Sequence, residues 1–126
     1  DFIIKKRLIG EMYNSLLSDI KTINLPLQQT DYCNNIHWVY AITLKDSFKK
    51  SAKNVMEELG KSEIGTRPFF FPMHKQPIFK KMGLFKDQDF KNASKLYEKG
   101  FYIPSGLGLS EKELEEVSLT LHKILE

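Results

Sequence analysis

Residues 36–44 read IHWVYAITL, and this short run decides the fold. It is rich in β-branched and aromatic side chains, which is typical of a β-strand. Successive side chains of a strand point to opposite faces of the sheet. We expect one face to carry Ile36, Trp38, Tyr40 and Ile42, and the other to carry His37, Val39, Ala41 and Thr43. Both sets are largely apolar, so the sequence predicts an inner strand of a sheet.

The segment before this strand has the apolar spacing of an amphipathic helix. Apolar residues recur every three or four positions and would form one stripe against a core. Residues 22–31 then break the period, and Pro26 marks a loop. The expected stripe consists of Ile4, Leu8, Ile9, Met12, Leu16 and Ile20.

A second helix is predicted directly after the strand. Asp46 or Ser47 can cap its first turn, and Gly60 can end it because glycine readily takes a positive φ. The expected buried face consists of Phe48, Ala52, Val55, Met56 and Leu59.

The C-terminal third predicts two more helices with a short strand between them. A helix ending at Gly100 carries Phe90, Ala93, Leu96 and Tyr97, and residues 101–109 read as a short strand and a turn. Ser110 and Glu113 have the spacing of a capping box at the start of the last helix. The inner stripe of that helix would be Leu114, Val117, Leu121 and Ile124.

These elements predict one α+β domain over residues 1–126, with a small antiparallel or mixed sheet covered by helices. The length of 126 residues suits a single core. The helical pattern is already present at Asp1, so we expect the chain to be a piece of a larger protein.

Composition excludes several classes of function. The net charge is only +3 and the basic residues are scattered, which argues against nucleic-acid binding. No apolar run approaches the roughly 20 residues needed to cross a bilayer, so we expect no membrane partner. The single cysteine, Cys33, cannot form an intrachain disulfide and fits a cytoplasmic location.

No complete catalytic or metal-binding motif is present. The three histidines, His37, His74 and His122, lie far apart without metal-ligand spacing, and His122 is interpreted as a helix-surface residue. Residues 47–54 contain lysines that fall mainly on the polar side of a helix, which indicates a solvated face. Residues 106–109 lack the lysine of a P-loop. We therefore expect no catalytic residue and no metal site.

Residues 63–79, EIGTRPFFFPMHKQPIF, hold the candidate binding residues. Pro68, Pro72 and Pro77 stiffen the backbone and favour an extended chain. An arginine on such a segment, Arg67, could engage a phosphate or carboxylate bidentately. A structural interpretation stays equally open, in which the three phenylalanines fill the core and Arg67 pairs with a carboxylate.

Three ordered blocks resemble one family. NNIHWVYAITL (34–44), IGTRPFFFPMHKQPIF (64–79) and NASKLYEKGFYIPSGLGLSEKELEEV (92–117) resemble the C-terminal part of the DegT/StrS-type sugar aminotransferases. Within that family the second block is most similar to perosamine synthases and their relatives. The resemblance spans about residues 6–125 and rests on the combination of blocks.

The resemblance implies a fold, a cofactor and a substrate. It implies the C-terminal small domain of a fold-type I, pyridoxal-phosphate-dependent transferase, which moves an amino group from glutamate to a keto nucleotide-sugar. It implies a homodimeric parent whose large domain holds the cofactor and the Schiff-base lysine. No motif of that large domain matches here, so we expect this chain to bind no cofactor and to be inactive alone. By resemblance, Thr66, Arg67, Phe71 and His74 are the expected substrate-binding residues.

One alternative belongs to a different class of function. The chain could be a free-standing, non-catalytic module that binds a sugar nucleotide or docks on a partner protein. The gene sequence upstream of Asp1 distinguishes the two, because only the transferase hypothesis requires a lysine-bearing domain in frame.

Overall fold

A computed structural model describes all residues, 1–126. Its helices are α1 (Phe2–Leu16), α2 (Ala52–Lys61), the 3-10 turn η1 (Met73–Lys75), α3 (Pro77–Lys81), α4 (Lys91–Lys99) and α5 (Glu111–Leu125). Its strands are β1 (Ile23–Asn24), β2 (Gln29–Thr30), β3 (Cys33–Asn34), β4 (Tyr40–Leu44), β5 (Arg67–Pro68) and β6 (Gly100–Ile103). None of the helices is both long and apolar enough to span a bilayer.

The main sheet has four strands in the order β1-β4-β6-β5, and every pairing is antiparallel. β4 and β6 form its centre, with Tyr40 opposite Ile103 and Ile42 opposite Phe101. β2 and β3 form a separate hairpin, where the sequence had predicted a loop over the β2 residues. The expected α+β architecture is confirmed, with an antiparallel rather than a mixed sheet.

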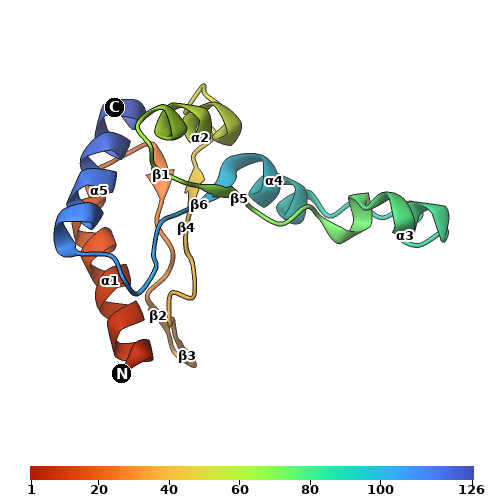
Figure 1. Cartoon of the computed structure of the whole chain (residues 1–126). Helices are drawn as coiled ribbons and strands as arrows, with labels where there is room; N and C mark the ends of the chain where they lie inside the picture. Colours follow the sequence, from red (N-terminus) through yellow and green to blue (C-terminus); the bar gives the residue numbers. More distant parts are fainter.

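Helices cover one face of this sheet (Figure 1). α1 and α5 lie side by side, and α2 packs against α5 and the end of the sheet. The core between them contains Ile9, Tyr13, Leu17, Ile20, Ile23, Tyr40, Ile42, Leu44, Ala52, Val55, Leu59, Ile64, Phe101, Ile103, Leu114, Val117, Leu121 and Leu125.

The stripe expected on the first helix differs from this core. Ile9 and Tyr13 on α1 are buried, as is Leu17 directly after it, whereas Ile4 and Leu8 are exposed. The stripe is rotated because Tyr13 packs on Tyr40 with ring centroids 4.8 Å apart. Its hydroxyl also donates to the Pro104 carbonyl at 2.7 Å, so an aromatic residue with a polar tip takes the central place.

The central strand begins later than predicted, at Tyr40, because the chain turns at His37. His37 has a positive φ of 48° and its ring is buried against α1. A Cβ at Gly10 would overlap that ring, so α1 needs glycine at the crossing. Trp38 is turned outward and is 67% exposed, although it was expected to share a face with Tyr40 and Ile42, which are buried.

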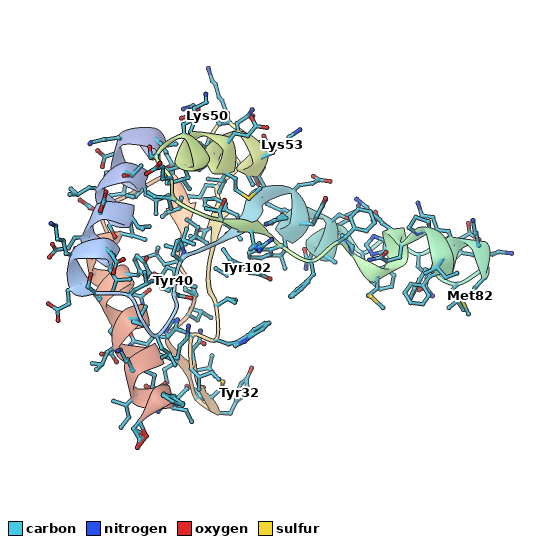
Figure 2. The ribbon with its side chains drawn as sticks, in the orientation of Figure 1. Tyr32, Tyr40, Lys50, Lys53, Met82 and Tyr102 are labelled. Carbon is cyan, nitrogen blue, oxygen red and sulfur yellow. The ribbon has the colours of Figure 1, made fainter.

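Residues 72–90, which we call the arm, extend away from the rest of the molecule, the body (Figure 1). The arm contains η1 and α3, and α3 starts with Pro77 at its first position, where proline costs no hydrogen bond. Figure 2 shows Tyr40 inside the body and Met82 at the far end of the arm. Within the arm only Pro72 is buried.

Candidate functional site

The face of the sheet opposite α1 and α5, which we call the open face, is built by the strand register. Tyr40, Ile42 and Leu44 point into the core, so Ala41 and Thr43 point to the open face. Residues that are directly opposite in an antiparallel pair share a face. Thr43 is opposite Asn24 and Gly100, and Ala41 is opposite Tyr102, which in turn is opposite Arg67.

Arg67 therefore projects from the open face at the edge strand β5. Its side chain is exposed and forms no ion pair with any carboxylate, so the structural interpretation of Arg67 as half of a salt bridge is wrong. The neighbouring Thr66 is half-buried and contributes no side-chain hydrogen bond. An unpaired guanidinium beside Tyr102 can bind an anion and still stack on an aromatic ring.

The three phenylalanines after Pro68 have three different environments. Phe69 stacks on Tyr102 with ring centroids 4.9 Å apart. It lies over Gly100, where an added Cβ would come within 2.7 Å of the ring. Phe70 is 72% exposed and meets Tyr102 edge-on at 6.1 Å. None of the three belongs to the core, so the alternative interpretation in which they fill the core is wrong.

Phe71 and His74 lie along α4 rather than beside Arg67. Phe71 is 41% exposed and packs edge-on against Tyr97, with ring centroids 5.1 Å apart. The Nε2 atom of His74 is 3.3 Å from the Ser94 hydroxyl oxygen. Ser94 and Tyr97 are one turn apart, so a single face of α4 holds both candidate residues.

The four expected substrate-binding residues thus form a line and not one pocket. Thr66 and Arg67 stand at the sheet edge, and the chain then runs along α4 to His74 at the base of the arm. Arg67 and His74 are seven positions apart, so their Cα atoms can be separated by at most ~23 Å. His74 also lines a separate basic hollow of about 490 Å³ with Lys80 and Lys86. Only an elongated ligand could contact all four residues.

Sequence reasoning missed two residues of this line, Phe70 and Tyr102. Phe70 carries the most exposed ring of the segment, and Tyr102 stacks with Phe69 and is opposite Arg67 in the sheet. Successive side chains of a strand point to opposite faces, so the sequence predicts that neighbouring phenylalanines face opposite ways. It does not predict which of them is exposed to solvent. The position of Tyr102 depends on the β5–β6 register, for which the sequence holds no local signal.

A comparison with models of protein families shows to which family this chain belongs. Residues 1–122 match the model of the DegT/DnrJ/EryC1/StrS aminotransferase family. The chain belongs to this family. The membership agrees with the three sequence blocks that resembled it.

Relatives within the family include GDP-perosamine synthase of Vibrio cholerae. It is 30% identical over 121 residues, which cover 93% of this chain and 31% of the relative. A putative pyridoxal phosphate-dependent aminotransferase of Bacillus subtilis, EpsN, is 24% identical over 110 residues, covering 86% of this chain and 28% of the relative. This chain therefore spans about a third of the length of the relatives that it matches.

Solved structures from the family share the fold. A putative sugar aminotransferase of Streptococcus pneumoniae, Spr1654 in its PMP form, superimposes with a TM-score of 0.85 at 16% identity. The match covers 98% of this chain and 30% of that one. PseC of Helicobacter pylori, an aminotransferase involved in pseudoaminic acid biosynthesis, gives 0.83 at 17% identity, covering 98% and 32%. These two aminotransferases thus contain the same α+β arrangement of helices and strands as this chain.

Lys6 and Lys95, two lysines whose ammonium groups are engaged by other residues, do not fit a pyridoxal phosphate site. Such a site needs a free lysine amine that can form a Schiff base, with a carboxylate for the pyridine nitrogen. Burial lowers the pKa of Lys6, but its ammonium donates to the carbonyl of Ser105 at 2.6 Å and to its hydroxyl at 3.2 Å. The ammonium of Lys95 is taken up by Asp46 on the exposed surface. Neither amine is both sheltered and free.

Proposed function

We propose that this chain is the substrate-recognising small domain of a pyridoxal-phosphate-dependent aminotransferase. The enzyme would transfer an amino group from glutamate to a keto sugar linked to a nucleotide, as in perosamine-type amino sugar synthesis. The observation that carries the proposal is the line of Thr66, Arg67, Phe71 and His74, with Arg67 exposed and unpaired. The family membership supplies the reaction class.

The line suits a long ligand with a charged middle. A nucleotide-sugar is elongated, and its diphosphate matches the planar fork of an arginine. Exposed Phe70 next to Arg67 offers a face for a ring, and His74 offers one nitrogen for a sugar hydroxyl or a phosphate oxygen. Recognition is thus the role of these side chains, and no step of the amino transfer is assigned to them.

The proposal includes the partners of the chain. The cofactor would be held by the large domain of the same enzyme, and the enzyme would act as a cytoplasmic homodimer. Pyridoxal phosphate added to this 126-residue polypeptide alone should give no aldimine absorbance that borohydride fixes at one lysine. A stoichiometric, fixable band would contradict the assignment of recognition alone to this chain.

Arg67 provides the kinetic test of the proposal. In an enzyme that contains this domain, Arg67→Ala should raise the KM for the nucleotide-sugar about tenfold, the size expected for one charge-assisted contact. The KM for glutamate should stay unchanged. Arg67→Lys should recover only part of the loss, because an ammonium lacks the bidentate fork.

A matched control separates recognition from general surface charge. Lys53 is an exposed cation on the outer side of α2 that pairs only loosely with Glu57, and Lys53→Ala should leave both KM values unchanged. Equal kinetics for the Arg67→Ala enzyme and the unmodified enzyme would refute the role of Arg67. A loss of thermal stability with no change in KM would refute it as well.

A further inference from the structure

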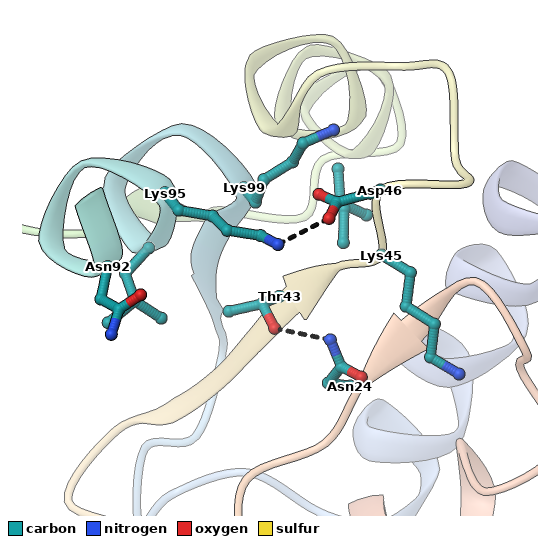
Figure 3. Close-up of a pocket in the computed structure, with 9 residues that line it drawn as sticks. Asn24, Thr43, Lys45, Asp46, Asn92, Lys95 and Lys99 are labelled. Atoms are coloured by element: carbon teal, nitrogen blue, oxygen red, sulfur yellow. Dashed lines mark hydrogen bonds and ion pairs between the residues drawn. The ribbon is translucent and has the colours of Figure 1, made fainter.

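A hollow on the open face lies apart from the proposed line of substrate contacts. It has a volume of about 530 Å³ and lies between the ends of β1 and β4 and the helix α4. Its polar lining comprises Asn24, Thr43, Lys45, Asp46, Lys95 and Lys99, with Asn92 at its edge (Figure 3). None of Thr66, Arg67, Phe71 or His74 lines it.

Positive charge dominates this hollow. Its lining residues include three lysines and one carboxylate, that of Asp46, which Lys95 binds at 2.6 Å. Neither Lys45 nor Lys99 has a carboxylate within 4.0 Å, so the charge of both is uncompensated. The hydrogen bond from Lys95, together with the charges of Lys95 and Lys99, lowers the pKa of Asp46.

The hollow is also lined by neutral groups that can form hydrogen bonds. The amide of Asn24 donates to the Thr43 hydroxyl at 3.2 Å, and the register of β1 and β4 fixes both on the open face. The apolar lining residues are only Leu44 and Leu96. Only two of its nine lining residues are hydrophobic, so the hollow suits a polar, anionic ligand better than an aromatic or lipid one.

Figure 3 shows how the lysines could reach such a ligand. Lys95 extends across the hollow to Asp46, whereas the ammonium groups of Lys99 and Lys45 stand on opposite sides. Lysine is a point charge on a flexible four-carbon stem, so both can turn inward without a change in the backbone. A phosphate group has several oxygens that can accept charge-assisted N–H donors from different side chains at once.

We propose that this hollow is a binding site for a phosphate group, either free or carried by a larger molecule. Lys99 and Lys45 supply the attraction, Asn24 and Asn92 supply amide donors, and Lys95 turns from Asp46 to the ligand. Asp46 acts against binding, because its carboxylate faces the anion and competes for Lys95. The site is independent of Arg67 and of the proposed transferase reaction.

Titration of the 126-residue chain with inorganic pyrophosphate tests the site. Amide chemical shifts are followed by NMR at constant ionic strength, with sodium chloride as the balancing salt. The shifts should saturate and should be largest at residues 43–46 and 92–99. Non-saturating shifts, or shifts spread over all lysine-bearing surfaces, would overturn the proposal because they indicate only screening of surface charge.

Four variants test whether the charged residues of the hollow determine the affinity for pyrophosphate. Lys99→Gln and Lys45→Gln should each weaken pyrophosphate binding about threefold or more, since each removes one full charge near the ligand. Asp46→Asn should tighten binding by a similar factor. Lys53→Gln, the exposed control on α2, should leave binding unchanged. Equal affinities for Lys99→Gln and Lys53→Gln, or weaker binding by Asp46→Asn, would overturn the proposal.

Two more measurements identify the source of the phosphate and separate this site from the substrate line. A nucleoside diphosphate that binds more tightly than pyrophosphate at residues 43–46 supports a carried phosphate, whereas tighter pyrophosphate supports the free ion. Arg67→Ala should not affect pyrophosphate binding in the hollow. Failure of the Arg67 kinetic test would therefore leave this site standing, and the reverse also holds.

Discussion

The body and the arm are built from similar residues but are stabilised in different ways. The body buries an unbroken core of 18 side chains between one sheet face and three helices. The arm also contains many aromatic and aliphatic residues, yet Met73, Ile78 and Met82 are all more than half exposed. Several of its rings pack on one another, as in the edge-on pair of Phe79 and Phe85 at 6.1 Å.

This difference indicates that apolar composition alone does not make a core. In the body, helices approach the sheet from one side, so each apolar side chain is surrounded. The arm is a single excursion of the chain with no second layer to cover it. Its stability must come from local hydrogen bonds and a few ring contacts, and it should open at a lower free energy than the body.

The largest effect should come from a matched pair of phenylalanine substitutions. Phe101 is fully buried in the body, and Phe101→Ala should lower the free energy of unfolding by about 3–5 kcal/mol. Phe79→Ala in the arm should cost about 1 kcal/mol or less, because its ring is only partly covered. Urea unfolding followed by circular dichroism measures both. Equal losses would contradict the distinction between body and arm.

A pair of glycine substitutions tests how closely the body is packed. Gly10→Ala should lower stability by about 1–3 kcal/mol, because the new methyl group would overlap the buried ring of His37. Gly60→Ala, in the last turn of α2, should raise stability by about 0.5–1 kcal/mol, since nothing lies within 4 Å of its Cβ position. Thermal melts should therefore shift in opposite directions, and two shifts of the same sign would count against tight packing at the α1 crossing.

The smallest expected effect depends on pH and concerns the contact between α1 and α5. His122 places Nε2 2.9 Å from the Leu16 carbonyl, at the end of α1, and Nδ1 3.0 Å from the Glu126 carboxylate. Both partners are acceptors, so they favour the doubly protonated ring and raise the pKa of His122. The expectation of a plain surface residue was therefore wrong.

The sign of this pH dependence follows from the raised pKa. The extra stability is fully present below the unfolded pKa of about 6.5 and is lost as the pH rises through the higher folded pKa. His122→Gln should thus cost more at pH 6 than at pH 9, by no more than about 1 kcal/mol because water reaches the pair. Asp19, 3.5 Å from Nε2, favours the charged ring in the same direction. A pH-independent difference between the two proteins would contradict this role.

Local signals in the sequence predicted the start of the last helix but not the start of the second one. The capping box of Ser110 and Glu113 forms as expected, because its hydrogen bonds join residues three positions apart. The second helix was predicted to start at Asp46 or Ser47, but it starts after Ser51, which forms its own capping box with Asn54. Asparagine at that position makes a weaker pattern than glutamate, so the signal was missed. The helix also continues through Gly60, and the positive φ falls on Glu63.

Long-range contacts account for most of the remaining errors. The late start of β4 depends on the space that Gly10 leaves for His37, a contact across 27 residues. Pro77 was expected to favour an extended chain but begins a helix, for a local reason, because the first position of a helix accepts proline. For the candidate site, the segment 66–74 was found from its motif, whereas its separation into a sheet edge and a helix-lined part depends on where α4 packs. No pattern of residues in the sequence predicts where α4 packs.

The two edge strands of the main sheet are both two residues long. β5 contains Pro68, which has no N–H to offer, and β1 is followed by Pro26. A further strand from another molecule would find almost no ladder on which to add, so the usual route to edge-to-edge aggregation is closed. The short edges of the main sheet therefore favour assembly of this domain through its faces.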